Sequence, residues 1–407
     1  MNRVQPSDGE RSVRLSSLTG LRFIAAFLVF VYHAHWLQAF SDKGLQSAYD
    51  SASFNLGNLG VAFFFVLSGF VLTWSARAGD GARSFWRRRF FKVFPNHVVA
   101  FALAFGLLLA AGITPAPTET VANLFLVHAW VPELSFITSV VSGVSWSLSV
   151  ELVFYLCFPL LIVLVRKVRP TRLWVFALTA GALVLALPAL SELLPQQPRF
   201  PYFDEVSWAQ AWTLYYGPLG RILEFVIGMF FARIVANGRD VRIGVLPAAL
   251  LVAAAYTATL YLPMSYGYAA LFPLPIALLI SAVARREIDG RATVLGGKAM
   301  VRLGEISYAF FLIHMTLLFS VHAAMAGQWA GYGEYQHLAW STPVALLFLA
   351  GVLVLSLALS WLMFTFVEMP VMRRWSRSRK APSQPEPVPA ASVRPEAPVA
   401  ARESSPV

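Results

Sequence analysis

The sequence contains few charged residues and a single cysteine. Charged residues make up 13% of the 407 positions, 57% are hydrophobic, and the mean hydropathy is +0.63. Soluble globular domains carry about 25% charged residues, so this composition excludes an ordinary soluble protein. Cys157 has no second cysteine to pair with, which excludes a disulfide scaffold. The class that remains is a polytopic membrane protein.

Motifs that mark several kinds of site are also missing. The chain has no zinc spacing of Cys and His, no Gly-Lys-Ser phosphate-binding loop, no dinucleotide fingerprint and no Gly-x-Ser-x-Gly elbow. His33 and His35 are a poor metal pair, because residues two apart on a helix do not face each other. We therefore expect no metal site.

The sequence contains instead a series of long apolar runs. A helix that crosses a bilayer needs about 20 mostly apolar residues. Ten segments meet this need: 18–37, 59–76, 93–112, 143–165, 173–190, 219–236, 243–262, 267–284, 306–326 and 343–367. The stretch 121–131 is apolar but too short to span, so we expect it to be interfacial or re-entrant. The predicted fold is all-α, a transmembrane bundle of about ten spanning helices.

The basic residues predict how this bundle is oriented. If the N-terminus is cytoplasmic and the chain crosses ten times, 29 of the 32 Lys and Arg residues lie on the cytoplasmic side. Only Lys43, Arg199 and Arg221 fall outside. Because Lys and Arg gather in cytoplasmic loops, we expect both termini in the cytoplasm. The same bias explains the net charge of +11, so we expect no nucleic-acid partner.

We expect one membrane domain between two cytoplasmic ends. Residues 1–16 form an N-terminal segment, 17–376 the transmembrane domain and 377–407 a tail. Seven prolines between 381 and 407, without periodicity, predict that the tail is disordered. The first apolar run is of spanning length and no clear small-residue cleavage site follows it, which argues against a secretory signal peptide.

Two costly polar residues share the first predicted helix. Arg22 and His33 are eleven residues apart, which leaves them about 20° apart around a helix axis and about 16 Å apart along it. They therefore share one face, with Arg22 near the cytoplasmic mouth and His33 in the outer half. An ionisable group inside a membrane segment is by default a candidate functional residue. The alternative is a snorkelling Arg and a hydrogen-bonded core His.

Glu151 is the third costly residue. It follows Trp146 and Ser147 at the outer end of the fourth predicted helix, at a depth expected to be similar to that of His33. A carboxylate beside a histidine can fix the tautomer of the ring and raise its basicity. The alternative is an interfacial Glu in contact with water.

A basic cluster lies in the second predicted loop. The run 83–95 contains three consecutive arginines and a lysine: Arg87, Arg88, Arg89 and Lys92. Guanidinium groups bind phosphate bidentately, so this cluster could hold a polyphosphate at the membrane mouth. The alternative is a topology anchor or a contact with lipid headgroups.

One further pair of opposite charges opens the sixth predicted helix. Arg221 and Glu224 are one turn apart. We interpret them as a structural pair on the outer side, with a substrate contact as the alternative.

Seven motifs occur in the order typical of one family. The sequence resembles the acyltransferase 3 family of integral membrane acyltransferases over about 15–376. The matching residues are Leu-Thr-Gly-Leu-Arg at 18–22 with His33, then 60–70, 87–95, 146–151 with Phe154 and Tyr155, 221–228, Gly-Glu-Ile-Ser-Tyr at 304–308 with His314, and 366–370.

The resemblance implies transfer of an acyl group, usually acetyl, from acyl-CoA to a hydroxyl. It makes His33 the expected catalytic base and Glu151 a catalytic or His-orienting residue. It assigns contacts to the coenzyme A phosphates to Arg22, Arg87, Arg88, Arg89 and Lys92. We further expect substrate contacts from residues in the matched motifs: Trp146, Ser147, Arg221, Glu224 and His314.

The sequence departs from the family pattern at two positions. Leu152 follows Glu151 where many members carry a second acidic residue, and Lys92 stands where an Arg is usual. Lys binds phosphate as a point charge, so the second change can alter the phosphate contacts. Some relatives carry an extra hydrolase-like domain, and here any such partner must be a separate periplasmic or envelope-biosynthesis protein.

The resemblance implies a bacterial inner membrane and a carbohydrate acceptor, such as a surface polysaccharide, a lipid-linked glycan or peptidoglycan. A small molecule such as a macrolide is the alternative acceptor. A secondary transporter or flippase would also show ten helices with intramembrane charges, but the two halves show no repeat. A glycosyltransferase would need an acidic motif in an outer loop, and none is clear.

Overall fold

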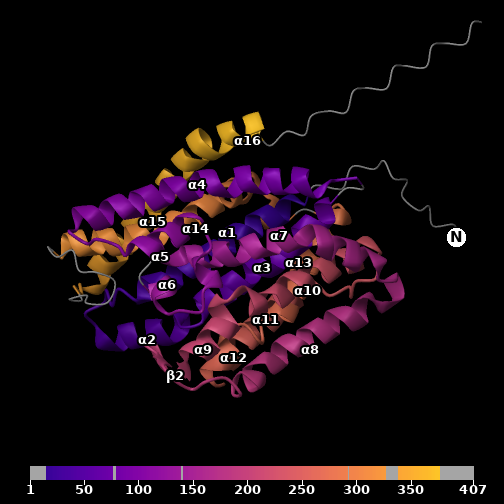
Figure 1. Cartoon of the computed structure of the whole chain (residues 1–407), viewed down its shortest axis with the longest axis horizontal. Helices are drawn as coiled ribbons and strands as arrows, with labels where there is room; N and C mark the ends of the chain where they lie inside the picture. Colours follow the sequence, from indigo (N-terminus) through magenta and orange to yellow (C-terminus); the bar gives the residue numbers. More distant parts are fainter. Residues whose placement is uncertain (1–14, 77–78, 139–140, 292, 327–337, 376–407) are drawn as a thin grey trace, which may run out of the picture.

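The computed structural model describes residues 15–76, 79–138, 141–291, 293–326 and 338–375. The long helices run side by side along the longest axis of the molecule (Figure 1). Most of the predicted N-terminal segment and the whole of the predicted tail lie outside the described residues. The division into a membrane domain and two cytoplasmic ends therefore stays a prediction.

The fold is built from α-helices with one small hairpin. The longer helices are α1 (Ser16–His35), α2 (Lys43–Ser53), α3 (Leu56–Ser75), α4 (Ala82–Ala110), α7 (Trp146–Lys167), α8 (Leu173–Ser191), α10 (Pro218–Ala236), α11 (Val245–Thr259), α13 (Pro273–Ile288), α14 (Lys298–Met325) and α15 (Thr342–Met363). The short α-helices are α5 (Pro117–Leu124), α6 (Ser135–Thr138), α9 (Trp208–Ala211), α12 (Met264–Tyr268) and α16 (Met369–Trp375). The 3₁₀ turns are η1 (His128–Trp130), η2 (Gly143–Ser145), η3 (Pro170–Arg172) and η5 (Val294–Gly296), and the π-helical turns are η4 (Trp212–Tyr216) and η6 (Phe364–Glu368). Strands β1 (Arg199–Phe200) and β2 (Phe203–Ser207) pair antiparallel.

Within the described residues, eight helical segments are long and apolar enough to cross a membrane, not the predicted ten. The predicted segments 219–236 and 243–262 do form helices, α10 and α11, but neither qualifies as a span. α10 carries Arg221, Glu224 and Arg233 within 19 residues, and α11 is only 15 residues long. Charges and length therefore remove two segments from the predicted set. The side on which the termini lie stays a prediction.

The basic cluster is helical and does not form a loop. α4 begins at Ala82, eleven residues before the predicted start at 93. Consecutive residues on a helix are about 100° apart, so the three arginines at 87–89 point in different directions. Arg89 and Lys92 are three apart and share a face. The helix therefore divides the cluster between different surroundings.

Small residues let the central helices approach closely, as small residues commonly do between membrane helices. A Cβ atom added to Gly69 of α3 would lie 1.9 Å from the carbonyl oxygen of Phe225 on α10. One added to Gly228 would lie 1.9 Å from the carbonyl oxygen of Val66. α3 also runs antiparallel to α1, because Gly57 abuts Tyr32. The end of α3 therefore lies beside the start of α1.

The stretch 121–131 is broken into short helices, α5 and η1. Buried polar contacts secure it: Asn123 Nδ2 donates to Ser145 Oγ at 2.7 Å, and Trp130 Nε1 donates to the Ser149 carbonyl at 2.8 Å. Non-helical backbone needs such partners where water is absent. Of these short helices, η1 packs against α7, which carries Glu151.

Candidate functional site

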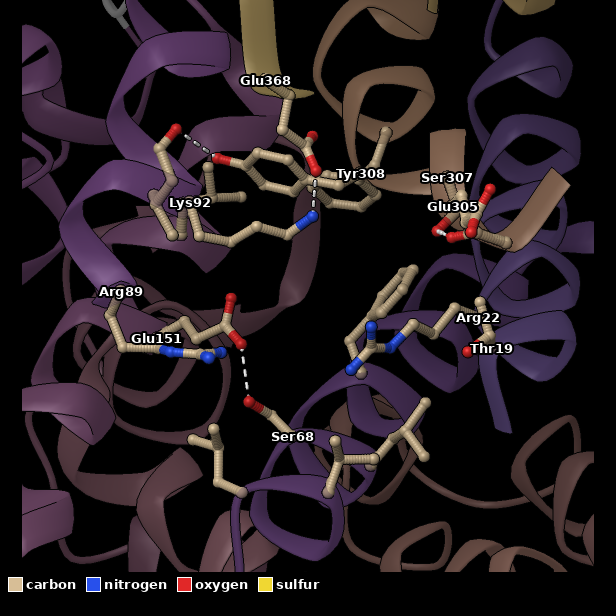
Figure 2. Close-up of a pocket in the computed structure, with 18 of the residues that line it drawn as sticks. Thr19, Arg22, Ser68, Arg89, Lys92, Glu151, Glu305, Ser307, Tyr308 and Glu368 are labelled. Atoms are coloured by element: carbon tan, nitrogen blue, oxygen red, sulfur yellow. Dashed lines mark hydrogen bonds and ion pairs between the residues drawn. The ribbon is translucent and has the colours of Figure 1, made fainter. Parts of the chain in front are cut away.

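A polar cavity of ≈ 360 Å³ lies between α1, α3, α4, α7, α14 and η6. Figure 2 shows Arg22 entering it from one side, and Arg89 and Lys92 of α4 from the other. The described part of its lining carries both signs of charge: Arg22, Arg89, Lys92, Glu151, Glu305 and Glu368. The cavity therefore brings together residues that are up to 346 positions apart in the chain.

Two guanidinium groups face this cavity without a carboxylate partner. Arg22 makes no hydrogen bond or ion pair with any described residue. Arg89 likewise pairs with none of them, and its buried Nε has no hydrogen-bond partner. The Arg89 guanidinium is held over the rings of Phe85 and Tyr155, 5.8 and 6.0 Å from their centroids. Unpaired guanidinium groups that are held in place can bind a phosphate.

Lys92 reaches the same cavity, but it is paired. Its Nζ forms an ion pair with Oε1 of Glu368, and Oε2 of Glu368 accepts a hydrogen bond from Asn96 Nδ2 at 2.6 Å. The Lys92 side chain is 29% exposed and that of Glu368 is 1% exposed. The carboxylate therefore anchors the lysine at the cavity wall and offsets its charge.

The other two arginines of the predicted cluster do not line this cavity. Arg87 is exposed. Arg88 forms an ion pair with Asp80 at 3.1 Å and donates a hydrogen bond to Ser84 Oγ at 2.9 Å. Of the four residues predicted to bind phosphates as one cluster, the structure brings only Arg89 and Lys92 to Arg22.

Glu151 lies in the cavity with Arg22 and away from the position expected beside His33. Its Oε1 accepts a hydrogen bond from Ser68 Oγ at 2.7 Å, as Figure 2 shows. His33 does not line the cavity, and none of its hydrogen bonds involves Glu151. Residue counts place a group along its own helix, but they do not fix how far two helices are offset. Ser147, one turn earlier, also lines the cavity and donates to the Val144 carbonyl at 3.0 Å.

The partner of His33 is His314, and their contacts determine the tautomers. His314 Nδ1 lies 3.2 and 2.8 Å from the carbonyl oxygens of Phe310 and Phe311. A carbonyl oxygen only accepts, so this Nδ1 carries the proton and Nε2 of the neutral ring holds the lone pair. His33 Nδ1 lies 3.0 Å from that Nε2 and 3.0 Å from the Val29 carbonyl, so it donates to both. His33 Nε2 is therefore the basic atom, and no described residue hydrogen-bonds to it.

Aromatic side chains of the cavity lining adjoin this histidine pair, which does not itself line the cavity. Phe64 and Phe311 line the cavity and meet edge to face, with ring centroids 5.4 Å apart. The Phe311 ring also lies 5.8 Å from the ring of His314. Phe311 therefore contacts both the cavity that holds the unpaired arginines and the ring of His314.

Three other predicted substrate residues lie away from the cavity lining. Trp146 packs on Tyr215 with ring centroids 4.5 Å apart. Arg221 Nε and Glu224 Oε1 are 3.0 Å apart, and both side chains are fully buried. Arg221 also donates to the Tyr268 carbonyl at 3.3 Å. The ion pair is thus buried within the bundle, in the arrangement expected of a structural pair.

Seven polar residues of the described cavity lining were not predicted as site residues: Thr19, Ser68, Tyr155, Glu305, Ser307, Tyr308 and Glu368. Each lies within a motif quoted for the family resemblance. Glu368 carried the clearest signal, because it is a lone carboxylate next to a long apolar run.

Comparisons with known proteins agree with these motifs. A family profile described as an acyltransferase domain matches residues 15–365. The chain is 39% identical to "Acyltransferase MdmB" of Streptomyces mycarofaciens, over 93% of this chain and 96% of the relative. It is 26% identical to "Nodulation protein 10" of Rhizobium leguminosarum bv. viciae, over 90% and 96%. It is 24% identical to "O-acetyltransferase OatA" of Staphylococcus aureus (strain NCTC 8325 / PS 47), over 76% of this chain and 51% of the relative. No solved structure matches the chain.

Proposed function

This chain belongs to the acyltransferase 3 family, and from that premise we propose that it is a multi-pass O-acyltransferase of a bacterial inner membrane. It moves an acyl group, expected to be acetyl, from cytoplasmic acyl-CoA to a hydroxyl of a carbohydrate acceptor. The observation that carries this proposal is a cavity with two unpaired guanidinium groups, those of Arg22 and Arg89, together with a nearby histidine, His33, whose Nε2 is basic. The family profile and two of the relatives, MdmB and OatA, are named as acyltransferases, which favours this function over a transporter or flippase.

The donor binds through the cations of the cavity. The diphosphate of coenzyme A has the charge and the oxygen geometry that guanidinium groups recognise. Arg22 and Arg89 supply them from opposite walls, and Lys92 adds a point charge held by Glu368. The three carboxylates of the lining keep the empty cavity near neutrality. The thioester arm then extends past Phe311 towards His33.

His33 acts as the general base of a direct transfer. Its Nε2 takes the proton from the acceptor hydroxyl while the hydroxyl oxygen attacks the thioester carbonyl carbon. The C–S bond then breaks, and the leaving thiolate takes the proton from the His33 imidazolium. The lone pair on His314 Nε2 and the Val29 carbonyl accept from Nδ1–H of His33 and stabilise the imidazolium. We therefore assign His314 a positioning role in place of the substrate contact expected from the sequence.

Glu151 remains a proposed catalytic residue of the cavity. Its carboxylate faces the donor side together with Arg22, with Ser68 as its hydrogen-bond partner. A role beside His33 would require the side chain to leave Ser68. An acyl-His33 intermediate is the competing route, and it predicts burst kinetics and a trapped acyl-protein.

The acceptor is the least constrained part of the proposal. The carbohydrate acceptor has the support of a relative named an O-acetyltransferase, although this chain spans only 51% of that relative. A small molecule such as a macrolide is the alternative acceptor. Either would approach from the side that the sequence predicts to be the outer one, near the C-terminal end of α1, which carries His33.

The first test measures ester-linked acetyl groups on surface glycans of the host. The gene is deleted and then restored as wild type, as His33→Ala or as His35→Ala, at matched membrane levels. We expect acetyl to fall on deletion and to return with the wild type and His35→Ala only. Full restoration by His33→Ala would contradict the role of the base. If deletion changes nothing, purified protein is assayed for acetyl-CoA cleavage with small-molecule acceptors, and an intact thioester there would contradict the function.

A further inference from the structure

A second hollow of ≈ 790 Å³ adjoins the polar cavity. It lies between the end of α3, the start of α4 and the end of α7. Its described basic lining is Arg88, Arg89 and Arg166, and Asp80 is the one carboxylate among its described lining residues. Leu72 and Arg89 line both hollows, so the two spaces meet at these residues.

We propose that this hollow binds the 3′-phosphoadenosine end of coenzyme A. The inference rests on the proposed function, which places the diphosphate at Arg22 and Arg89 in the first cavity and directs the thioester arm past Phe311 towards His33. The nucleotide must then leave the diphosphate on the side away from His33. The adjoining hollow is where the lining of the first cavity continues past Arg89. Both volumes lie in the range of about 300–1,000 Å³ that is typical of small-molecule sites.

The charges of the hollow suit a phosphate monoester. Three guanidinium groups against one carboxylate leave an excess of positive charge. Arg88 uses part of its donor set on Asp80 at 3.1 Å, and Arg166 donates one hydrogen bond to the Ala76 carbonyl at 3.0 Å. A guanidinium has five N–H donors, so both residues keep donors for a ligand. The Arg88 and Asp80 side chains are 22% and 34% exposed, which leaves this pair open to competition.

The remaining wall is apolar and aromatic. Phe85 and Phe158 stack with ring centroids 4.7 Å apart, and Pro159 and Ile162 continue the same surface on α7. An adenine ring offers a flat apolar face that can pack on such a wall. The hollow thus pairs an apolar surface with a phosphate-binding edge, as an adenosine 3′-phosphate requires.

The test compares the binding of coenzyme A and 3′-dephospho-coenzyme A to the purified full chain in lipid nanodiscs. We expect wild type to bind coenzyme A about five- to tenfold more tightly, as expected for partly exposed charge-assisted hydrogen bonds. Arg88→Ala and Arg166→Ala should each reduce this preference without changing the affinity for the dephospho ligand. Asp80→Asn should increase the preference, because it releases Arg88. Lys167→Ala, on the next residue of α7, is the matched control and should change neither affinity.

Equal affinity for the two ligands would overturn the inference, as would Arg variants that weaken both ligands equally. An anionic lipid headgroup could supply the same phosphate chemistry, so the binding is repeated with phosphatidylglycerol in the nanodiscs. The Arg variants could retain less phosphatidylglycerol than wild type while their affinity for coenzyme A is unchanged. That result would assign the hollow to lipid and would also overturn the inference. Acetyl-CoA cleavage is measured in the same samples after the candidate carbohydrate and small-molecule acceptors are added. Tighter binding of coenzyme A than of the dephospho ligand, without acetyl-CoA cleavage, would overturn the proposed function and leave the inference standing. Acetyl-CoA cleavage with equal affinity for the two ligands would overturn the inference and leave the proposed function standing.

Discussion

Lys92 and Glu368, 276 positions apart in the chain, form an ion pair on the wall of the cavity. The pair joins α4 to η6, and Asn96 binds the second carboxylate oxygen at 2.6 Å. Lys92 is thus both a structural partner of a buried carboxylate and a cation at the proposed donor site. These two roles can be separated by mutation.

We expect Lys92→Met to destabilise the protein by about 3–5 kcal/mol, because it leaves Glu368 charged and buried without its cation. The double variant Lys92→Met with Glu368→Gln should recover most of this stability, since the amide has no charge. Its affinity for acetyl-CoA should stay low. Thermal unfolding and donor binding measure the two effects, and recovery of both would leave Lys92 a structural role only.

Arg22 has no partner among the described residues, so its loss should cost little stability. We expect Arg22→Gln to weaken acetyl-CoA binding by about 10- to 100-fold, the effect of about 1.5–3 kcal/mol for a charge-assisted hydrogen bond. Lys298→Gln, an exposed change at the start of α14, is the control. A large fall in the unfolding midpoint with unchanged binding would show that Arg22 is structural.

His314 should act on turnover and not on donor binding. His314→Leu removes the acceptor for Nδ1–H of His33, and we expect kcat to fall about 10²-fold with little change in the KM for the donor. His314→Gln offers an amide oxygen as a replacement acceptor and should retain more activity than the Leu variant. The pH profile of kcat should shift in His314→Leu. Equal activity of both variants and wild type would rule out the positioning role.

The α3–α10 contact leaves no space for a side chain at Gly69 or Gly228. We expect Gly69→Ala to destabilise by about 1–3 kcal/mol or more, because its Cβ would meet backbone atoms that cannot move away alone. Gly106 and Gly351 are helical glycines with open space around them. Gly106→Ala and Gly351→Ala should be neutral or stabilising by up to about 1 kcal/mol. Unfolding midpoints in one detergent compare all three variants.

His128 lies in η1, outside the candidate spans, and is fully buried. Burial lowers the pKa of His128 to about 3, whereas an unperturbed histidine has a pKa of about 6.5. Between about pH 3 and 6.5, His128 is therefore protonated in the unfolded chain but neutral in the folded chain. Stability is full above about pH 6.5 and is lost as the pH falls towards 3, by up to about 1.4 kcal/mol per pH unit. His128→Asn should flatten this decline in unfolding midpoints measured at about pH 7.5 and 5. An unchanged slope would contradict the assignment.

The helices were largely predictable because their signals are local. Apolar runs located each helix to within a few residues in most cases, including α10 and α11, which do not qualify as spans. The largest errors are at the starts of α4 and α14, whose polar first turns extend eleven and eight residues before the predicted apolar runs, and α13 starts six residues later than predicted. The family was also predictable from the sequence, because seven motifs stand in the family's order along one chain, and the family profile matches residues 15–365.

The sequence by itself determined what lies on one helix, such as the common face of Arg22 and His33, since the helical period is fixed at 3.6 residues per turn. It could not determine which groups meet across helices. Three contacts, those of Glu151 with Ser68, His33 with His314, and Lys92 with Glu368, depend on the offset and rotation of packed helices. That geometry is fixed by close packing at residues such as Gly69 and by the short helices before α7, and so only the tertiary structure decided it.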